Sequence, residues 1–419
     1  MIPNPSLSTK TETTIKLPLS FILFGLGSFV FSQLVLFLNS EALFHGYFRI
    51  PELLMGAHFL LLGWVVMVVM GSMYQLVPVA FLTPIWSEKL GFVQLIITAL
   101  GVTVFSLLLG FKPNVAVYGA TLVVVGILLF LYQMIRTLMK QEQKNTMTLF
   151  VVTALFCFFL TILAGFLLAW NMAFGGSFNY SAVFHSHILL GVAGWFSLLI
   201  FGFSYKMVPM FSLSHGFSMK YAKFAFISYA MGLFLLIISF WLSNIILTRI
   251  GWVLLLIGFT CFSFDMREII HKRIKKKLDR PFVFSLISII YGWIIHVIAV
   301  VLSLLSITSQ TVWSWLIFAY IVSWIIFSIL GYLYKIVPFL WWTHKYSGLV
   351  GKEKVPLLKN MIDEKLGSLI FILLPISVFG LVTAALFHIN FLVLLFQGLM
   401  LSLSILYSIS IIRVLFQKP

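Results

Sequence analysis

Long apolar runs constrain this chain of 419 residues more than any other feature. Runs of about 18 residues or more are typical of membrane-spanning helices, because about 20 residues of helix are needed to cross a bilayer. The alternating segments of a membrane β-barrel are absent. Only 9% of the residues are charged, against roughly a quarter in soluble domains. The sequence therefore predicts an all-α integral membrane protein.

The runs divide the chain into twelve expected spans. These cover residues 17–39, 53–80, 90–111, 115–135, 148–170, 182–210, 222–243, 247–265, 282–306, 312–339, 367–387 and 390–414. Of the 27 Lys and Arg residues, only Arg49, Lys112 and Arg249 fall on the side opposite the N-terminus. Because cytoplasmic loops are enriched in Lys and Arg, this asymmetry predicts both termini in the cytoplasm and the chain in the cell (plasma) membrane. Residues 1–16 form the expected cytoplasmic tail.

The same distribution accounts for the formal net charge of +16. A strongly basic chain could bind nucleic acid, but these basic residues lie in short loops, so orientation in the lipid bilayer is the better interpretation. The basic run at 267–280 is expected to face anionic lipid. Cys157 and Cys261 lie inside apolar runs without C-x-x-C spacing and are expected to be core residues. No nucleic-acid partner is predicted.

A pattern of five residues recurs three times with constant spacing. The copies are Trp64, Gly71, Tyr74, Val77 and Pro78; Trp195, Gly202, Tyr205, Val208 and Pro209; and Trp324, Gly331, Tyr334, Val337 and Pro338. They recur about every 130 residues, which leaves room for four spans in each copy. We therefore expect twelve transmembrane helices in three pseudo-threefold four-helix repeats, at 17–140, 141–277 and 278–419. The repeated tyrosines, with Lys206 and Lys335, are expected at the membrane interface, where aromatic and snorkelling side chains gather.

Acidic residues are expected only in loops or at span ends. All eleven Asp and Glu residues follow this pattern. Proton pumps and ion-coupled transporters usually place carboxylates in mid-membrane, so their absence there weighs against both classes. A transporter would also be expected to show a six-plus-six repeat or broken helices. No phosphate-binding glycine loop and no nucleophile-base pair is found, so catalytic residues cannot be named.

Histidines remain as candidates for chemistry. Five of the nine lie in or beside spans, and the predicted topology places them in the outer half of the membrane: His58, His185, His187, His296 and His388. A lone intramembrane histidine is usually a packing residue, but several at similar depth favour haem or metal ligation. Counted back from the repeated Trp, His185 shares the face of His58, and His187 looks away. This phase argument assumes regular helix between each His and its Trp.

Twelve spans in three arcs, with His58 on the second span and the His-x-His of 185–187 on the sixth, resemble the haem-copper oxidase catalytic subunit superfamily. The local pattern H-x-H-I-L-L-G-x-x-G-W also resembles the NnrS-type branch, whose members are haem and copper membrane proteins linked to nitric oxide resistance. The resemblance implies that His58 matches the second-span ligand of a low-spin haem. It also implies that the sixth-span histidine matches a copper ligand. The tenth span, 312–339, lacks the histidines of an oxidase, which makes proton-pumping oxygen reduction improbable.

Three functions are consistent with these features. The first is a haem-binding redox protein with b-type haem held by His58 and either His187 or His185. It would act on nitric oxide or oxygen, or pass electrons from quinol, with an accessory redox subunit as a candidate partner. Copper at His296 or His388 is a weaker second-site prediction. The alternatives are a cofactor-free assembly or partner subunit, and a polytopic transporter.

Overall fold

The structure is a computed structural model that describes residues 14–142 and 144–417. Most of the predicted tail at 1–16 lies outside the described residues. Over the described ranges the chain is helical, and twelve helices are long and apolar enough to cross a membrane. The predictions of an all-α fold and of twelve spans are therefore confirmed, and the protein is a multi-pass membrane protein. The orientation and the threefold arrangement of the repeats stay predictions.

Each predicted span corresponds to one helix or to one continuous stack of helical segments. The first four spans are α2 (Lys16–Leu38), the stack α4 (Pro51–His58), η1 (Phe59–Val66) and α5 (Met67–Phe81), then α6 (Glu88–Phe111), and η2 (Pro113–Val115) with α7 (Ala116–Leu138). The next four are α8 (Thr146–Phe174), the stack α9 (Tyr180–Leu189), η3 (Leu190–Ser197) and α10 (Leu198–Ser212), then α11 (Ala222–Leu242) and α12 (Ile245–His271). The last four are α13 (Arg280–Leu304), the stack α14 (Gln310–Tyr320), η4 (Ile321–Ile326) and α15 (Phe327–Tyr346), then α16 (Glu364–Leu386) and α17 (Asn390–Leu415).

Polar side chains mark where several helices begin. Ser87 caps α6 by accepting from Leu90 N, and Asn145 forms a capping box with Thr148 at the start of α8. Asn244 caps α12 by accepting from the backbone N–H groups of Ile246 and Leu247. These contacts satisfy backbone N–H groups that a helix leaves unpaired in its first turn, and such groups are costly wherever water is scarce.

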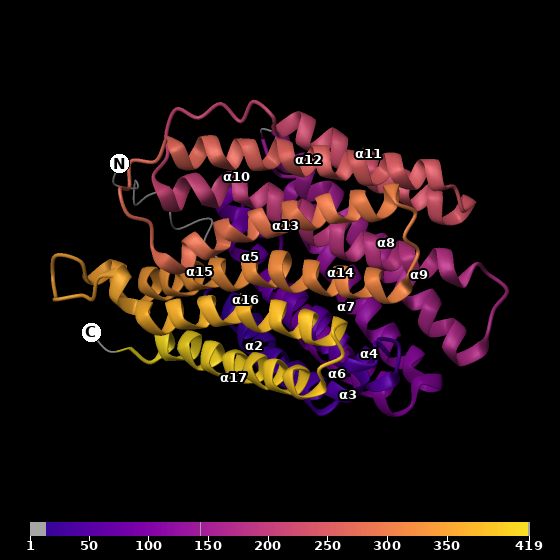
Figure 1. Ribbon diagram of the computed structural model, residues 1–419. Coiled ribbons are helices and arrows are strands. Elements are labelled where there is room, and N and C mark those ends of the chain that lie inside the picture. The colour runs from indigo at the N-terminus through magenta and orange to yellow at the C-terminus, as the bar shows by residue number, and fades with distance from the viewer. Residues whose placement is uncertain (1–13, 143, 418–419) are drawn as a thin grey trace. The chain divides into compact units, whose positions relative to one another are not determined.

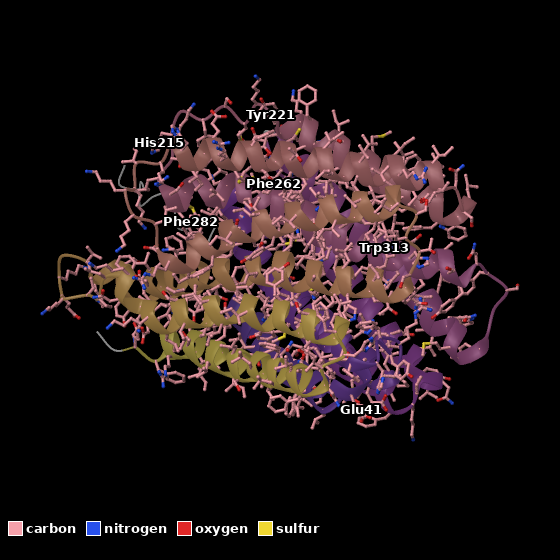
Figure 2. The ribbon with its side chains drawn as sticks, viewed as in Figure 1. Glu41, His215, Tyr221, Phe262, Phe282 and Trp313 are labelled. Carbon is pink, nitrogen blue, oxygen red and sulfur yellow. The ribbon has the colours of Figure 1, made fainter. Side chains whose placement is uncertain are left out.

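The chain forms two compact units. Unit 1 comprises residues 1–137, 279–286 and 326–419, and unit 2 comprises residues 138–278 and 287–325. In unit 1, α2 packs against η1, α5 and α17, and α16 lies beside α17 (Figure 1). In unit 2, α8 packs against α9, η3 and α10, and α11 pairs with α12. Figure 2 shows His215, in the loop after α10, and Trp313, in the first turn of α14, toward opposite ends of unit 2.

Aromatic stacking around the repeated tryptophans anchors both units. Trp64 stacks on Phe29 of α2 with ring centroids 4.2 Å apart, and Trp195 stacks on Phe158 of α8 at 4.3 Å. Trp64, Trp195 and Trp324 are all fully buried. Large rings buried in this way contribute much of the packing in a helical interior, where offset stacking is favoured.

The repeated tyrosines are buried inside the protein, whereas their expected depth at the membrane interface stays a prediction. Tyr74 donates to Gln94 Oε1 at 3.1 Å, and Tyr334 donates to Ser410 Oγ at 2.9 Å. The third member, Tyr205, donates to Asp265 Oδ2 at 2.9 Å. Each phenol hydroxyl therefore has a partner inside the protein, as a buried hydroxyl requires.

Candidate functional site

The repeated tryptophans lie in three π-helical segments, η1, η3 and η4. Each segment ends two residues after its Trp, at Val66, Ser197 and Ile326 respectively. A π-helix has i→i+5 hydrogen bonds in place of i→i+4 bonds, and such segments occur often at functional sites. The assumption of regular helix between each His and its Trp is therefore wrong. The irregularity has the same offset from Trp64 and from Trp195, so it cancels when the two helices are compared.

His58 ends α4, immediately before η1, and is half-buried. Its Nδ1 lies 2.8 Å from the carbonyl oxygen of Leu54, one turn earlier. Its ring meets the ring of Phe105 on α6 edge-on, with centroids 5.2 Å apart. When Nδ1–H donates to a carbonyl, the lone pair of the neutral imidazole is on Nε2, which is the arrangement found in histidines that bind metal.

His187 and His185 lie on opposite sides of α9. His187 is half-buried against α8, and its Nδ1 lies 3.0 Å from the carbonyl oxygen of Thr161. Gly165 makes this approach possible, because a Cβ there would lie 2.8 Å from His187 Cε1. His185 is exposed, with Nδ1 3.3 Å from Ser181 Oγ.

The contacts of the three histidines are consistent with the predicted relation between their faces. The ring of His185 lies 5.4 Å from that of Phe240 on α11, the third helix of its predicted repeat. His58 likewise contacts α6, the third helix of the first predicted repeat. His187 faces the opposite way, toward α8.

His296 and His388 have very different surroundings. His296, near the middle of α13, is 2% exposed. Its Nδ1 lies 2.7 Å from Gly292 O, and its Nε2 lies 3.4 Å from Tyr229 Oη. His388 is exposed in the turn between α16 and α17, where its φ of 56° is in the left-handed region. Its ring lies 5.9 Å from that of Phe44.

Taken separately, His58 and His187 each have the tethering that suits a haem ligand. Both rings are tethered through Nδ1 to a backbone carbonyl. The same two helical stacks carry buried polar atoms that have no hydrogen-bond partner among the described residues: Trp64 Nε1, Ser186 Oγ and Trp195 Nε1. Unpaired buried polar atoms are costly, and a bound polar group with its ordered waters would satisfy them.

Copper fits these residues poorly. Copper sites in proteins usually combine several imidazole or sulfur ligands. Within the described ranges no group of three or more His, Cys, Asp or Glu residues is placed to hold a metal ion. Both ring nitrogens of His296 contact protein groups, and His388 is exposed in a turn. Copper at either histidine stays a sequence-based prediction.

Sequence reasoning missed a buried carboxylate, Asp265. The eighth span was expected to end at this residue, whereas α12 continues to His271. Asp265 is 0% exposed; its Oδ2 accepts from Tyr205 Oη, and its Oδ1 accepts from Tyr221 N at 3.1 Å. Asp265 lies within the last two turns of α12, near the end of the span as expected, but its burial was not predicted. The apolar residues that follow, Ile269 and Ile270, were the signal that the helix continues.

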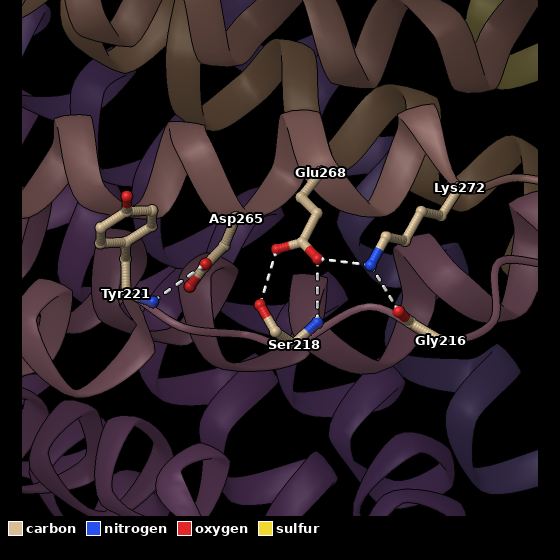
Figure 3. A network of polar contacts seen from close by, with 6 residues as sticks. All are labelled: Gly216, Ser218, Tyr221, Asp265, Glu268 and Lys272. Carbon is tan, nitrogen blue, oxygen red and sulfur yellow. Dashed lines mark hydrogen bonds and ion pairs between the residues drawn. The ribbon is translucent and has the colours of Figure 1, made fainter.

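The neighbouring turn of α12 fixes the loop between α10 and α11. Glu268 accepts from Ser218 N at 3.1 Å and from Ser218 Oγ at 2.8 Å, and it pairs with Lys272 at 2.9 Å. Lys272 in turn donates to the carbonyl of Gly216 (Figure 3). Together with the Asp265–Tyr221 contact, this network holds the loop against the last turns of α12. We assign it a structural role.

Comparison with known proteins identifies the fold. No model of a protein family matches the sequence, and no curated protein matches it either. Among solved structures, a haem-copper terminal oxidase seen as a dimer by cryo-electron microscopy superposes with a TM-score of 0.69. The match covers 97% of this chain and 85% of the oxidase chain, at 13% identity.

The chain has the fold of a haem-copper terminal oxidase chain. At 13% identity the likeness concerns the fold alone. The predicted oxidase-like scaffold is therefore confirmed, and the resemblance to the NnrS-type branch stays a prediction.

Proposed function

We propose that this chain is a haem-binding membrane redox protein built on an oxidase-like scaffold. The observation that carries the proposal is His58. It stands on the second span of an oxidase-like fold with Nδ1 tethered to Leu54 O, so that its lone pair is on Nε2. Histidine is the usual axial ligand of b-type haem, and apolar surroundings shelter the cofactor.

His187 is the second ligand that we favour, ahead of His185. A ligand must be held in one orientation by its surroundings. His187 has this support from Thr161 O and from the space left by Gly165, whereas His185 is exposed on the other side of α9, where its Nδ1 lies 3.3 Å from Ser181 Oγ. His58 lies in unit 1 and His187 in unit 2. Ligation of one haem by both histidines is therefore a proposal.

A bound haem would supply one-electron chemistry. The role of the chain is to orient the imidazoles and to keep water away from the cofactor. The substrate classes that we propose are a small gas, nitric oxide or oxygen, and quinol as the electron donor, with an accessory redox subunit as a partner. The proposed location is the plasma membrane, with both termini in the cytoplasm. Proton pumping is not part of the proposal.

A cofactor-free partner or assembly subunit is the second candidate. His296 favours it, because hydrogen bonds within the protein account for both of its ring nitrogens. On this alternative His58 and His187 would likewise be packing residues that stabilise α4 and α9.

Ligand substitution separates the candidates. His58→Ala, His187→Ala and His185→Ala should be expressed with ample haem supply and compared with His215→Ala, an exposed loop control. Visible spectra of the oxidised and dithionite-reduced proteins report the spin state of the haem. We expect His58→Ala and His187→Ala to lose haem or to become high-spin, and the other two to match the wild type. An unchanged spectrum in His58→Ala would refute that ligand. Folded, haem-free protein in every case would favour the second candidate.

A further inference from the structure

A chain of polar side chains is buried in unit 2. Tyr229 of α11, Tyr320 of α14 and Ser197 of η3 are each less than 8% exposed, and they join His296 in a continuous series of contacts. The successive distances are 3.4 Å from His296 Nε2 to Tyr229 Oη, 3.1 Å from Tyr229 Oη to Tyr320 Oη, and 2.7 Å from Tyr320 Oη to Ser197 Oγ. At the far end Ser197 Oγ lies 3.1 Å from the carbonyl oxygen of Val192.

The hydroxyl hydrogens of this chain can point in two directions. Gly292 O fixes Nδ1 of His296 as a donor, so Nε2 of the neutral ring is an acceptor. The hydrogens then run from Ser197 to Tyr320, to Tyr229 and to His296. If Nε2 carries a proton, it becomes a donor to Tyr229. Tyr229 then donates to Tyr320, and Tyr320 donates to Ser197. Ser197 then donates to Val192 O.

We propose that His296, Tyr229, Tyr320 and Ser197 form a membrane-buried proton relay that ends on His296. A proton that reaches Ser197 Oγ displaces the hydroxyl hydrogen of Ser197 toward Tyr320. Tyr320 passes its own hydrogen to Tyr229, and Tyr229 passes its hydrogen to His296 Nε2. One proton enters, one N–H bond forms on the imidazole, and each hydroxyl keeps one hydrogen. Release from His296 reverses the series.

Burying four polar side chains inside a membrane protein has a free-energy cost. Ionisable and polar side chains inside a membrane are expensive and commonly mark proton paths, and connected hydrogen bonds polarise one another in a low-dielectric interior. Trp324 Nε1 also donates to Ser197 Oγ at 3.1 Å, so this hydroxyl is held within the network.

The surroundings of His296 contain few other titratable groups. Tyr229 and Tyr320 face it from α11 and α14, and α12 faces it with the apolar ring of Phe259, whose centroid is 4.5 Å away. The Cys157 thiol of α8 is a further titratable group near Tyr229. Within the described part of unit 2, no charged side chain forms an ion pair or hydrogen bond with this ring. The relay does not depend on the proposed haem.

Infrared spectroscopy of the full-length protein tests the relay. The tyrosines are isotopically labelled at the ring carbon that bears the hydroxyl, and spectra are recorded from acidic to alkaline pH. Because the chain contains nine histidines, the protonation step that belongs to His296 is the one missing from His296→Gln. For the wild type we expect this step to be accompanied by a shift of tyrosine C–O bands. His296→Gln, which can accept a hydrogen bond but not a proton, should lose both. Tyr74→Phe, which removes a buried tyrosine bonded to Gln94, should retain both.

Tyr229→Phe is a second test variant, in case His296→Gln does not fold. It leaves His296 in place but breaks the chain, so the imidazole step should remain while the accompanying tyrosine shift is lost. Thermal unfolding establishes that each variant is folded. A tyrosine shift that persists in Tyr229→Phe would overturn the relay. So would wild-type tyrosine bands that stay constant while pH is varied.

Discussion

At the residue scale, identical side chains at repeated positions have different partners. Tyr74, Tyr205 and Tyr334 share one place in the sequence pattern, yet they donate to an amide, a carboxyl group and a hydroxyl, respectively. The spacing of the three tyrosines could be read from the sequence. Their hydrogen-bond partners could not be predicted, because Gln94, Asp265 and Ser410 come from different helices at unrelated distances along the chain. The same limitation hid the contacts of His296, although the residue itself was named.

The buried carboxyl should make Tyr205 the most costly of these tyrosines to lose. Tyr205→Phe removes one of the two hydrogen bonds that Asp265 accepts, and a buried polar group left short of a partner costs about 1–3 kcal/mol. Tyr334→Phe removes a bond between two hydroxyls and is the matched control. Thermal unfolding in the same detergent should show the larger loss for Tyr205→Phe. An equal or larger loss for Tyr334→Phe would contradict this assignment.

At the element scale, the twelve helices could be predicted because apolar length alone identifies a membrane span. The π segments could not, because a run such as FLLLGWVV is equally apolar on every face and carries no signal for i→i+5 bonding. The end of α12 was misplaced for a related reason. A charged residue after an apolar run suggests the end of a span, whereas Asp265 is accommodated inside the helix by Tyr205 and Tyr221.

The π segment η1 should determine which way His58 points. Inserting one alanine directly after His58 would rotate His58 relative to Trp64 by about 100°. We expect the insertion to abolish the haem spectrum as His58→Ala does. Leu61→Ala keeps the chain length and should retain the wild-type spectrum. An insertion variant with unaltered haem binding would show that the irregular turn does not position this histidine.

At the scale of the whole molecule, the fold could be predicted further than the site. Five repeated residues and two histidine positions suggested an oxidase-like scaffold, and the superposition extends over 97% of the chain. The candidate ligands could also be named, because histidines are scarce in these spans. Their burial and tethering could not, since these depend on Thr161, Gly165 and Leu54, which resemble any other apolar or small residues in the sequence.

The content of haem in the purified protein tests the central claim most directly. The chain should be produced in cells that have ample haem, purified in mild detergent, and analysed for haem and for protein in the same sample. The account predicts at least one b-type haem per folded chain, low-spin in the oxidised state. Folded protein that contains no haem under these conditions would contradict it.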